Sequence, residues 1–180
     1  MEIVSIFGKN LFAIKHTGEE KDEFSRLFEL WQDPEYLEDF FENNMDDLGN
    51  GFWGSISIEK AIFKTFEYAK EFEKTLLDLS EKSSSGQIDG LKIIFKPLYD
   101  TQYLTTSFKK SKAKQTWLRL YALRVEDDVY IITGGAIKLT QKMQDRKHTD
   151  LELKKLENCR RFLIDLGIVD VNGVIEEIES

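Results

Sequence analysis

The run Trp117–His148 constrains the fold most, because it contains two strand patterns joined by a short acidic turn. Residues 117–125 are rich in aromatic, leucine and valine side chains, which favour strands. After Glu126-Asp127-Asp128, the chain returns through an apolar run over residues 128–140. This pattern is typical of an antiparallel hairpin. Gly134-Gly135 interrupts the second strand, and we interpret this pair as a β-bulge.

The rest of the sequence predicts one further hairpin and several helices. Residues 2–15 hold two apolar runs around a Gly-Lys-Asn turn. Apolar residues at helical spacing predict two helices joined at Asp33-Pro34, and a long third helix capped by Ser57. The pattern Thr149-Asp150-Leu151-Glu152 is typical of a capping box and predicts the start of a closing helix. Residues 99–115 have no clear period, and we interpret them as an irregular basic loop with some extended structure.

These elements predict a single α+β domain. We expect an antiparallel sheet of about five strands, covered on one face by helices. Its strands would come from residues 2–15, 92–98, 117–125 and 128–140. Residues 1–90 would supply a hairpin and acidic helices, and residues 91–180 the remaining strands and the closing helix. With one cysteine and no apolar run near the ~20 residues of a membrane span, the chain is expected in the cytoplasm.

Charge is distributed unevenly along the chain, whose net charge is -8. Residues 1–107 carry 11 Lys and Arg against 21 Asp and Glu, whereas residues 108–148 carry 10 against 4. A basic segment on an acidic body can form a local anion-binding face. Charged side chains on a strand can also serve only to discourage aggregation, so both interpretations are kept.

Metal, cofactor and nucleophile chemistry have little support in the sequence. The soft ligands His16, His148 and Cys159 are far apart and lack metal-ligand spacing. Cys159 falls on an apolar helical stripe, which favours a core position. Gly134-Gly135 is not followed by the pattern of a phosphate-binding loop. We therefore expect neither a metal nor a cofactor.

A basic surface remains as the candidate site. Arg119 and Tyr121 are predicted to share one strand face with Trp117. Lys138 lies on the returning strand and Lys142 just after it, with His148 further on. Such side chains can cleave a phosphodiester without a metal, contact phosphate or face an acidic partner. The further residues expected to bind RNA or a partner are Lys109, Lys110, Lys112, Lys114, Arg124, Arg146 and Lys147.

Residues 92–165 resemble the RelE/HigB-type toxins of bacterial toxin–antitoxin systems. The resemblance rests on Lys96-Pro97-Leu98, on Arg119 and Tyr121, and on the run Lys138-Leu139-Thr140-Gln141-Lys142. It implies a compact sheet with a closing helix, and here also an enlarged helical N-terminal part. It further implies a metal-independent mRNA endoribonuclease. In that activity Arg119 and Lys138 would stabilise phosphate, Tyr121 would orient the substrate, and Lys142 or His148 would move protons.

Two hypotheses about function follow from these residues. In the first, the chain is a RelE/HigB-like toxin or a degenerate relative, whose partners are mRNA or the ribosome and a neutralising antitoxin. In the second, it is a non-catalytic interaction protein whose basic hairpin docks an acidic partner or a second copy of the chain. Neither hypothesis involves a membrane.

Overall fold

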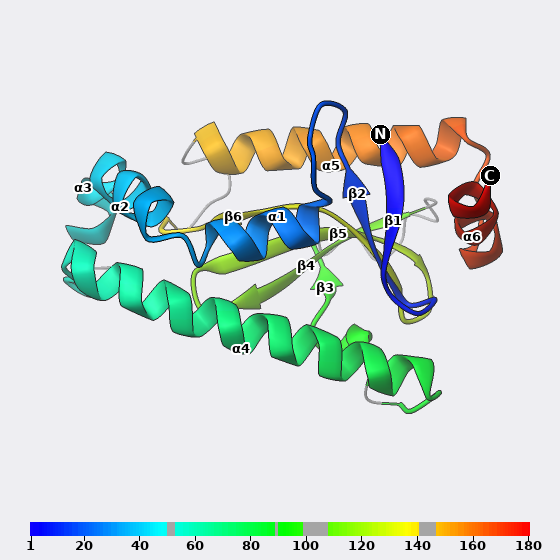
Figure 1. The fold of residues 1–180 in the computed structure, drawn as a ribbon, viewed down its shortest axis with the longest axis horizontal. Coiled ribbons are helices and arrows are strands. Elements are labelled where there is room, and N and C mark those ends of the chain that lie inside the picture. Colours follow the sequence, from blue (N-terminus) through cyan, green and yellow to red (C-terminus); the bar gives the residue numbers. More distant parts are fainter. Residues whose placement is uncertain (50–52, 89, 99–107, 141–146) are drawn as a thin grey trace.

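The computed structural model describes residues 1–180 except 50–52, 89, 99–107 and 141–146. Strands and helices come in separate runs along the chain, in an α+β arrangement (Figure 1). The strands are β1 (Glu2–Phe7), β2 (Leu11–Lys15), β3 (Lys96–Pro97), β4 (Lys109–Gln115), β5 (Leu118–Glu126) and β6 (Val129–Ile137). The helices are α1 (Glu23–Leu30), α2 (Pro34–Asn43), α3 (Met45–Gly49), α4 (Ile58–Ser84), the 3-10 turn η1 (Leu91–Ile93), α5 (Lys147–Asp165) and α6 (Val171–Glu179). None of the described helices is both long and apolar enough to cross a membrane.

The strands form one sheet in the order β1-β2-β6-β5-β4-β3. The predicted hairpins β1–β2 and β5–β6 are confirmed as antiparallel pairs. The predicted α+β class, with helices covering a sheet, is confirmed. The sheet is mixed rather than purely antiparallel, because β2 runs parallel to β6, and among the described residues it has six strands where about five were expected. A parallel neighbour is possible here because helices and other strands lie between β2 and β6 in the chain.

Helices cover both faces of the sheet, so the expectation of one covered face was also wrong. One core lies between the sheet and α1, α2 and α4, and includes Trp31, Phe72 and Leu120. The second lies between the opposite face and α5 and α6, and includes Tyr121 and Leu156. Figure 1 shows α4 and α5 on opposite sides of the sheet. We call these two sides the α4 side and the α5 side.

Local capping confirms two helix starts and corrects a third. The Asp33 carboxylate accepts hydrogen bonds from the backbone of Glu35 and Tyr36 at the start of α2. The Ser57 hydroxyl caps α4 in the same way. The predicted capping box of α5 was wrong, because the helix already begins at Lys147 and Thr149 is buried within it. Glu152 therefore does not cap the start of α5 and instead pairs with Lys155.

Strand β4 was missing from the expected sheet. Its sequence alternates lysines with Ser111 and Ala113, so it lacks the apolar residues by which strands are usually recognised. Neighbouring β5 supplies the missing context, because β4 pairs with it over its whole length from Lys109 to Gln115. Tertiary pairing therefore makes a strand of residues that we had interpreted as loop.

The glycine pair of β6 lets helices approach both faces of the strand. A side chain at Gly134 would overlap the Glu152 carboxylate of α5. One at Gly135 would lie 2.5 Å from the Arg119 carbonyl and 2.8 Å from Leu27 Cδ1 of α1. The predicted bulge falls one residue earlier, at Thr133, where the register with β5 shifts. The pair thus serves close packing rather than the bulge itself.

We predict that Gly135→Ala destabilises the protein by about 2 kcal/mol or more, because rigid backbone blocks the added methyl group. Gly173→Ala is the matched control. Its Cβ would meet nothing closer than 3.5 Å, and alanine favours the helix α6 in which it lies. Urea unfolding followed by circular dichroism would measure both changes. Equal stability of the two variants would contradict the packing role of Gly135.

Candidate functional site

Three lysines of β4 lie on the α5 side of the sheet. Residues paired across antiparallel strands point to the same face. Lys110 pairs with Leu123 and Lys112 with Tyr121. Both partners belong to the core under α5. The next pair along the two strands, Lys114 and Arg119, therefore lies on this side too.

Lys138, the first residue after the neighbouring strand β6, joins these residues. Ala136 pairs with Arg119 and packs in the core under α5, whereas Ile137 and Leu139 pack on the α4 side. Alternation along the chain places Lys138 on the side of Ala136. Residues predicted separately as catalytic and as binding thus share one face. We name it the cationic face, and it comprises Lys110, Lys112, Lys114, Arg119 and Lys138.

Arg119 and Tyr121 lie in different environments, although they share this face. The Arg119 guanidinium is half-buried, and its Nη1 donates hydrogen bonds to the carbonyls of Thr116 and Leu118. Burial lowers the pKa of Arg119. Tyr121 is fully buried, and burial raises the pKa of its hydroxyl. Trp117 was predicted on their face but packs on the α4 side, against Phe41 and Tyr68.

Helix α5 contributes two arginines that the sequence did not indicate. The Glu157 carboxylate lies 2.5 Å from Lys110 Nζ, 3.4 Å from Arg160 Nη1 and 3.5 Å from Arg161 Nε. The hydrogen bond from Lys110 lowers the pKa of Glu157. The Glu157 carboxylate thus forms ion pairs with three cations, one on β4 and two on α5, so the cationic face continues onto α5. Helical spacing alone could not show that Arg160 lies beside a strand more than forty positions earlier.

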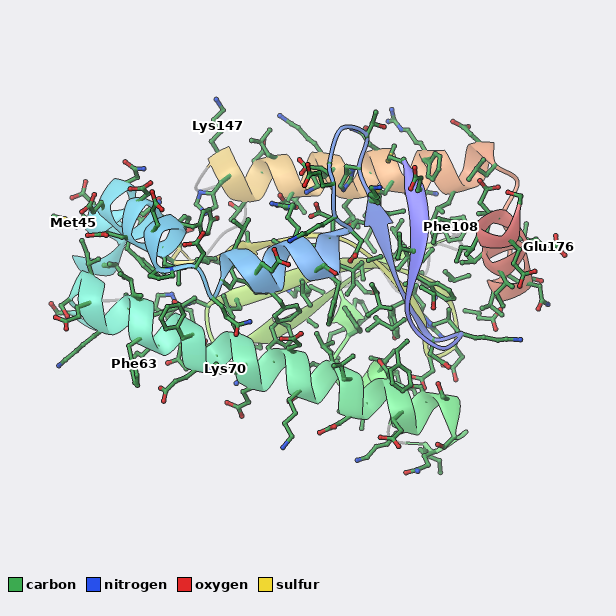
Figure 2. The ribbon with its side chains drawn as sticks, in the orientation of Figure 1. Met45, Phe63, Lys70, Phe108, Lys147 and Glu176 are labelled. Carbon is green, nitrogen blue, oxygen red and sulfur yellow. The ribbon has the colours of Figure 1, made fainter. Side chains whose placement is uncertain are left out.

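The remaining predicted residues do not join the cationic face. Lys109 pairs with Arg124, and alternation places both on the α4 side. Lys147 and His148 begin α5, where the Lys147 side chain points away from the body (Figure 2). His148 Nε2 instead hydrogen bonds the Ile137 carbonyl at 3.1 Å. The predicted residues Lys142 and Arg146 lie outside the described part of the chain.

A buried charge cluster joins α1 to α5 beside β6. Glu23 is 1% exposed and accepts hydrogen bonds from Arg26 Nε at 2.8 Å, Arg26 Nη2 at 2.9 Å and Lys155 Nζ at 2.9 Å. Burial alone would raise the pKa of Glu23, but these cationic donors outweigh it and lower the pKa. His16 Nε2 lies 4.0 Å from the same carboxylate and 2.9 Å from the Thr133 carbonyl. The cluster holds α1 and α5 together across the edge of β6.

A cavity of about 150 Å³ lies next to this cluster. Its polar lining residues are Arg26, Tyr36, His148 and Glu152. Burial raises the pKa of Glu152, while Lys155 opposes that change. Burial also raises the pKa of Tyr36. The polar lining residues come from α1, α2 and α5, so no single sequence motif could have revealed the cavity.

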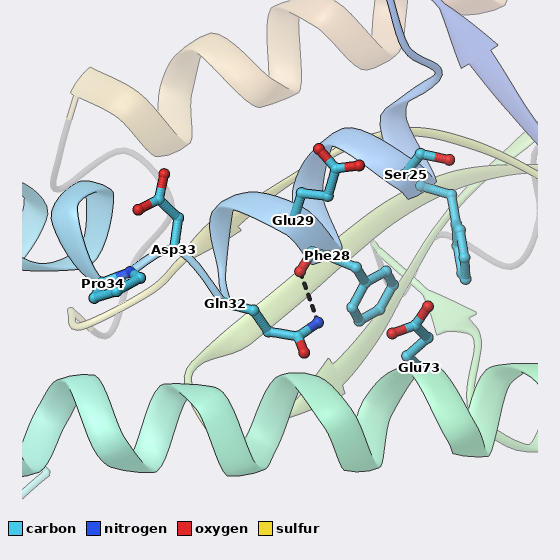
Figure 3. A pocket seen from close by; sticks show the side chains of 8 residues that line it. Ser25, Phe28, Glu29, Gln32, Asp33, Pro34 and Glu73 are labelled. Atoms are coloured by element: carbon cyan, nitrogen blue, oxygen red, sulfur yellow. Dashed lines mark hydrogen bonds between the residues drawn. The ribbon is translucent and has the colours of Figure 1, made fainter.

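A larger groove of about 500 Å³ lies between α1, the start of α2 and α4 (Figure 3). It is lined by Phe24, Ser25, Phe28, Glu29, Gln32, Asp33, Pro34 and Glu73. Three carboxylates and no cation line it, and Glu29 already pairs with Lys21 at 2.5 Å. None of the predicted site residues lies there. Its charge is opposite to that needed for binding phosphate.

No family model, curated protein or solved structure matches the chain. Within the described ranges, no group of three or more His, Cys, Asp or Glu side chains could hold a metal ion. Cys159 is buried, and burial raises the pKa of its thiol to about 12, which confirms its predicted core position. The cationic face and the cavity are therefore the candidate functional sites of the described chain.

We predict that Glu23→Gln lowers the free energy of unfolding by about 3 kcal/mol, because two cations lose a buried carboxylate. Glu29→Gln removes an exposed partner of Lys21 and should cost less than about 1 kcal/mol. Chemical denaturation of both variants tests the difference. If the two substitutions cost the same, Glu23 does not join α1 to α5 as described.

Stability should fall as the pH drops below 6.5, the ordinary pKa of histidine. Burial lowers the pKa of His16 in the folded state. Between 6.5 and that lowered value the unfolded chain binds a proton that the folded chain does not, which favours unfolding. His16→Gln should flatten this part of the stability profile. An unchanged slope in the variant, measured by urea unfolding at a series of pH values, would contradict the prediction.

Proposed function

We propose that the chain is a RelE/HigB-like toxin or a degenerate relative, and that its cationic face holds the phosphate backbone of mRNA. The observation that carries the proposal is the convergence of Lys110, Lys112, Lys114, Arg119 and Lys138 on one face of the sheet, from β4, from β5 and from the position just after β6. Basic side chains aligned in this way are the usual means of binding a nucleic-acid backbone. The proposed setting is the cytoplasm, where mRNA is available.

The spacing of the lysines suits an extended strand of RNA. Successive positions on one face of an antiparallel strand are about 7 Å apart, which places Lys110, Lys112 and Lys114 in a row along β4. At the Lys110 end of this row, the Glu157 carboxylate contacts both Lys110 and the α5 residues Arg160 and Arg161, which extend the row. Arg119 lies beside the other end of the row, across from Lys114. Its hydrogen bonds to backbone carbonyls hold the guanidinium in place before any phosphate arrives.

Support for phosphate binding is stronger than support for bond cleavage. Tyr121 is buried beneath α5 and cannot reach a substrate without movement of that helix. His148 points to the cavity rather than to the cationic face. Arg119 and Lys138 keep the phosphate-stabilising roles that the resemblance implies. The degenerate relative, which binds RNA without cleaving it, is therefore part of the proposal.

One observation favours the second hypothesis, a protein partner on the same face. Lys110 already binds a carboxylate, that of Glu157. An acidic segment of an antitoxin, or of a second copy of the chain, could present further carboxylates to Lys112 and Lys114 in the same way. Such a partner would compete with RNA for the face.

We predict that Lys112→Ala/Lys114→Ala weakens binding of single-stranded RNA and lowers the slope of log affinity against log salt by about 1.4, because two phosphate contacts are lost. Lys109→Ala is the matched control, since Lys109 lies on the same strand but points to the α4 side. Fluorescence anisotropy with a labelled oligonucleotide measures both quantities. Equal losses in the control, or no RNA binding by the wild type, would contradict the proposed face.

Induced expression in a bacterium tests the cleavage step. The toxin predicts growth arrest with cleaved transcripts, and Arg119→Ala should relieve both effects. Normal growth with intact transcripts would contradict nuclease activity. If RNA binding persists in that case, the degenerate relative is supported. Displacement of RNA by an acidic partner protein would favour the second hypothesis.

A further inference from the structure

The Glu157 carboxylate links α5 to the cationic face. Its Oε2 lies 2.5 Å from Lys110 Nζ on β4. Its Oε1 lies 3.4 Å from Arg160 Nη1 and 3.5 Å from Arg161 Nε. These arginines follow Glu157 by three and four positions, so the next turn of α5 brings both side chains beside it. Three cations from a strand and a helix thus surround one anionic group. We call Lys110, Arg160 and Arg161 the three-cation site.

The three-cation site suits a phosphate group as well as a carboxylate. Lysine and arginine donate charge-assisted hydrogen bonds to the oxygens of either anion, and the planar fork of arginine matches both. Each phosphodiester of an RNA backbone carries one negative charge, as the Glu157 carboxylate does. A phosphate could therefore replace the carboxylate without changing the net charge of the site.

Glu157 can leave the site at little cost. Solvent reaches both side chains of its contact with β4, since 27% of Lys110 and 28% of Glu157 are exposed, and Arg161 is 70% exposed. Ion pairs that solvent reaches add little to stability, because water and salt compete for both charges. Rotation about the side-chain bonds of Glu157 would carry its carboxylate away from Lys110 without moving α5.

Glu157 stays ionised at neutral pH. The hydrogen bond from Lys110 lowers the pKa of the Glu157 carboxyl, and burial opposes this change only in part. The free protein therefore holds an anion at the Lys110 end of the row on β4. Lys112 is the next lysine on this face, about 7 Å along the strand. An RNA backbone that contacts Lys112 thus reaches a neighbouring position that a negative charge already fills.

Resting on the RNA-binding function proposed above, we infer that the three-cation site binds one phosphate group of the RNA, and that Glu157 occupies this site until the RNA displaces it. Glu157 is then a competitor within the chain and lowers the affinity for RNA. A strand that also contacts Lys112 and Lys114 gains the free energy needed for the displacement. A single phosphate without those contacts does not.

The test is the binding of a labelled seven-nucleotide uridine RNA to the full chain, measured by fluorescence anisotropy. Glu157→Gln keeps the size of the side chain and removes its charge. We expect this variant to bind roughly tenfold more tightly, as one hydrogen bond to a charged group allows. In a Lys110→Ala background the same substitution should gain less than about threefold, because the cation that Glu157 blocks is then missing. Thermal unfolding checks that the variants fold.

Glu176→Gln is the matched control, because it removes the same charge from α6, where Glu176 points into solvent at the other end of the molecule (Figure 2). It should change the affinity by less than about twofold, since salt screens distant charges. An equal gain in Glu157→Gln and the control would overturn the inference and leave the RNA-binding function intact. A gain that persists undiminished without Lys110 would overturn it too.

If neither the wild type nor Glu157→Gln binds RNA, the proposed function fails, and inorganic pyrophosphate decides the inference. Calorimetric titration should then show tighter binding to Glu157→Gln than to the wild type, and Lys110→Ala should abolish the difference. Equal binding to both proteins, or binding to neither, would overturn the phosphate site. RNA binding by Glu157→Gln alone would support both the site and the proposed function.

Discussion

The structure depends on the tight coverage of β6 from both sides. This strand lies in the middle of the sheet, and two helices approach its glycine pair from opposite faces. At Gly134 the carboxylate of Glu152 occupies the place of a side chain, and at Gly135 Leu27 does so. Larger residues would push α5 or α1 outward, and both cores would lose contacts at once. Helix α1 from the N-terminal half of the chain and helix α5 from the C-terminal half therefore both pack against β6 at this glycine pair.

The buried charge cluster follows from the same arrangement. Because β2 ends early, α1 rather than a strand covers the edge of β6 and meets α5 around it. Polar backbone groups on such an edge need partners. The two histidines of the chain provide them, His16 at the Thr133 carbonyl and His148 at the Ile137 carbonyl. Glu23 then holds the cations of both helices in place. Polar side chains thereby fill the gap in the sheet.

Local features could be predicted from the sequence, whereas contacts between residues far apart in the chain could not. The cap at Asp33 involves only neighbouring residues, so it was recognisable. Alternation on β5 correctly put Arg119 and Tyr121 on one face, but it could not show that α5 buries Tyr121. Strand β4 was missed because its lysines leave no apolar pattern. The cavity was missed because Arg26 and Glu152 are distant in the chain. The glycine pair was its one visible trace, since glycine within a strand often marks a close approach.

The separation of charge across the sheet makes the acidic protein compatible with the proposed RNA-binding face. The exposed acids of α2, among them Glu35 and Glu38, belong to the helical layer on the α4 side. The cationic face lies on the α5 side, beyond the sheet. Packed layers are about 10 Å apart, while charges in physiological salt are screened over about 8 Å. A phosphate at Lys112 would therefore respond mainly to Lys110, Lys114 and Arg119 rather than to the net charge of -8. The positions of the charges therefore matter more than their sum: the acids of α2 lie beyond the sheet, and Glu157 is paired with the cations of the cationic face and α5.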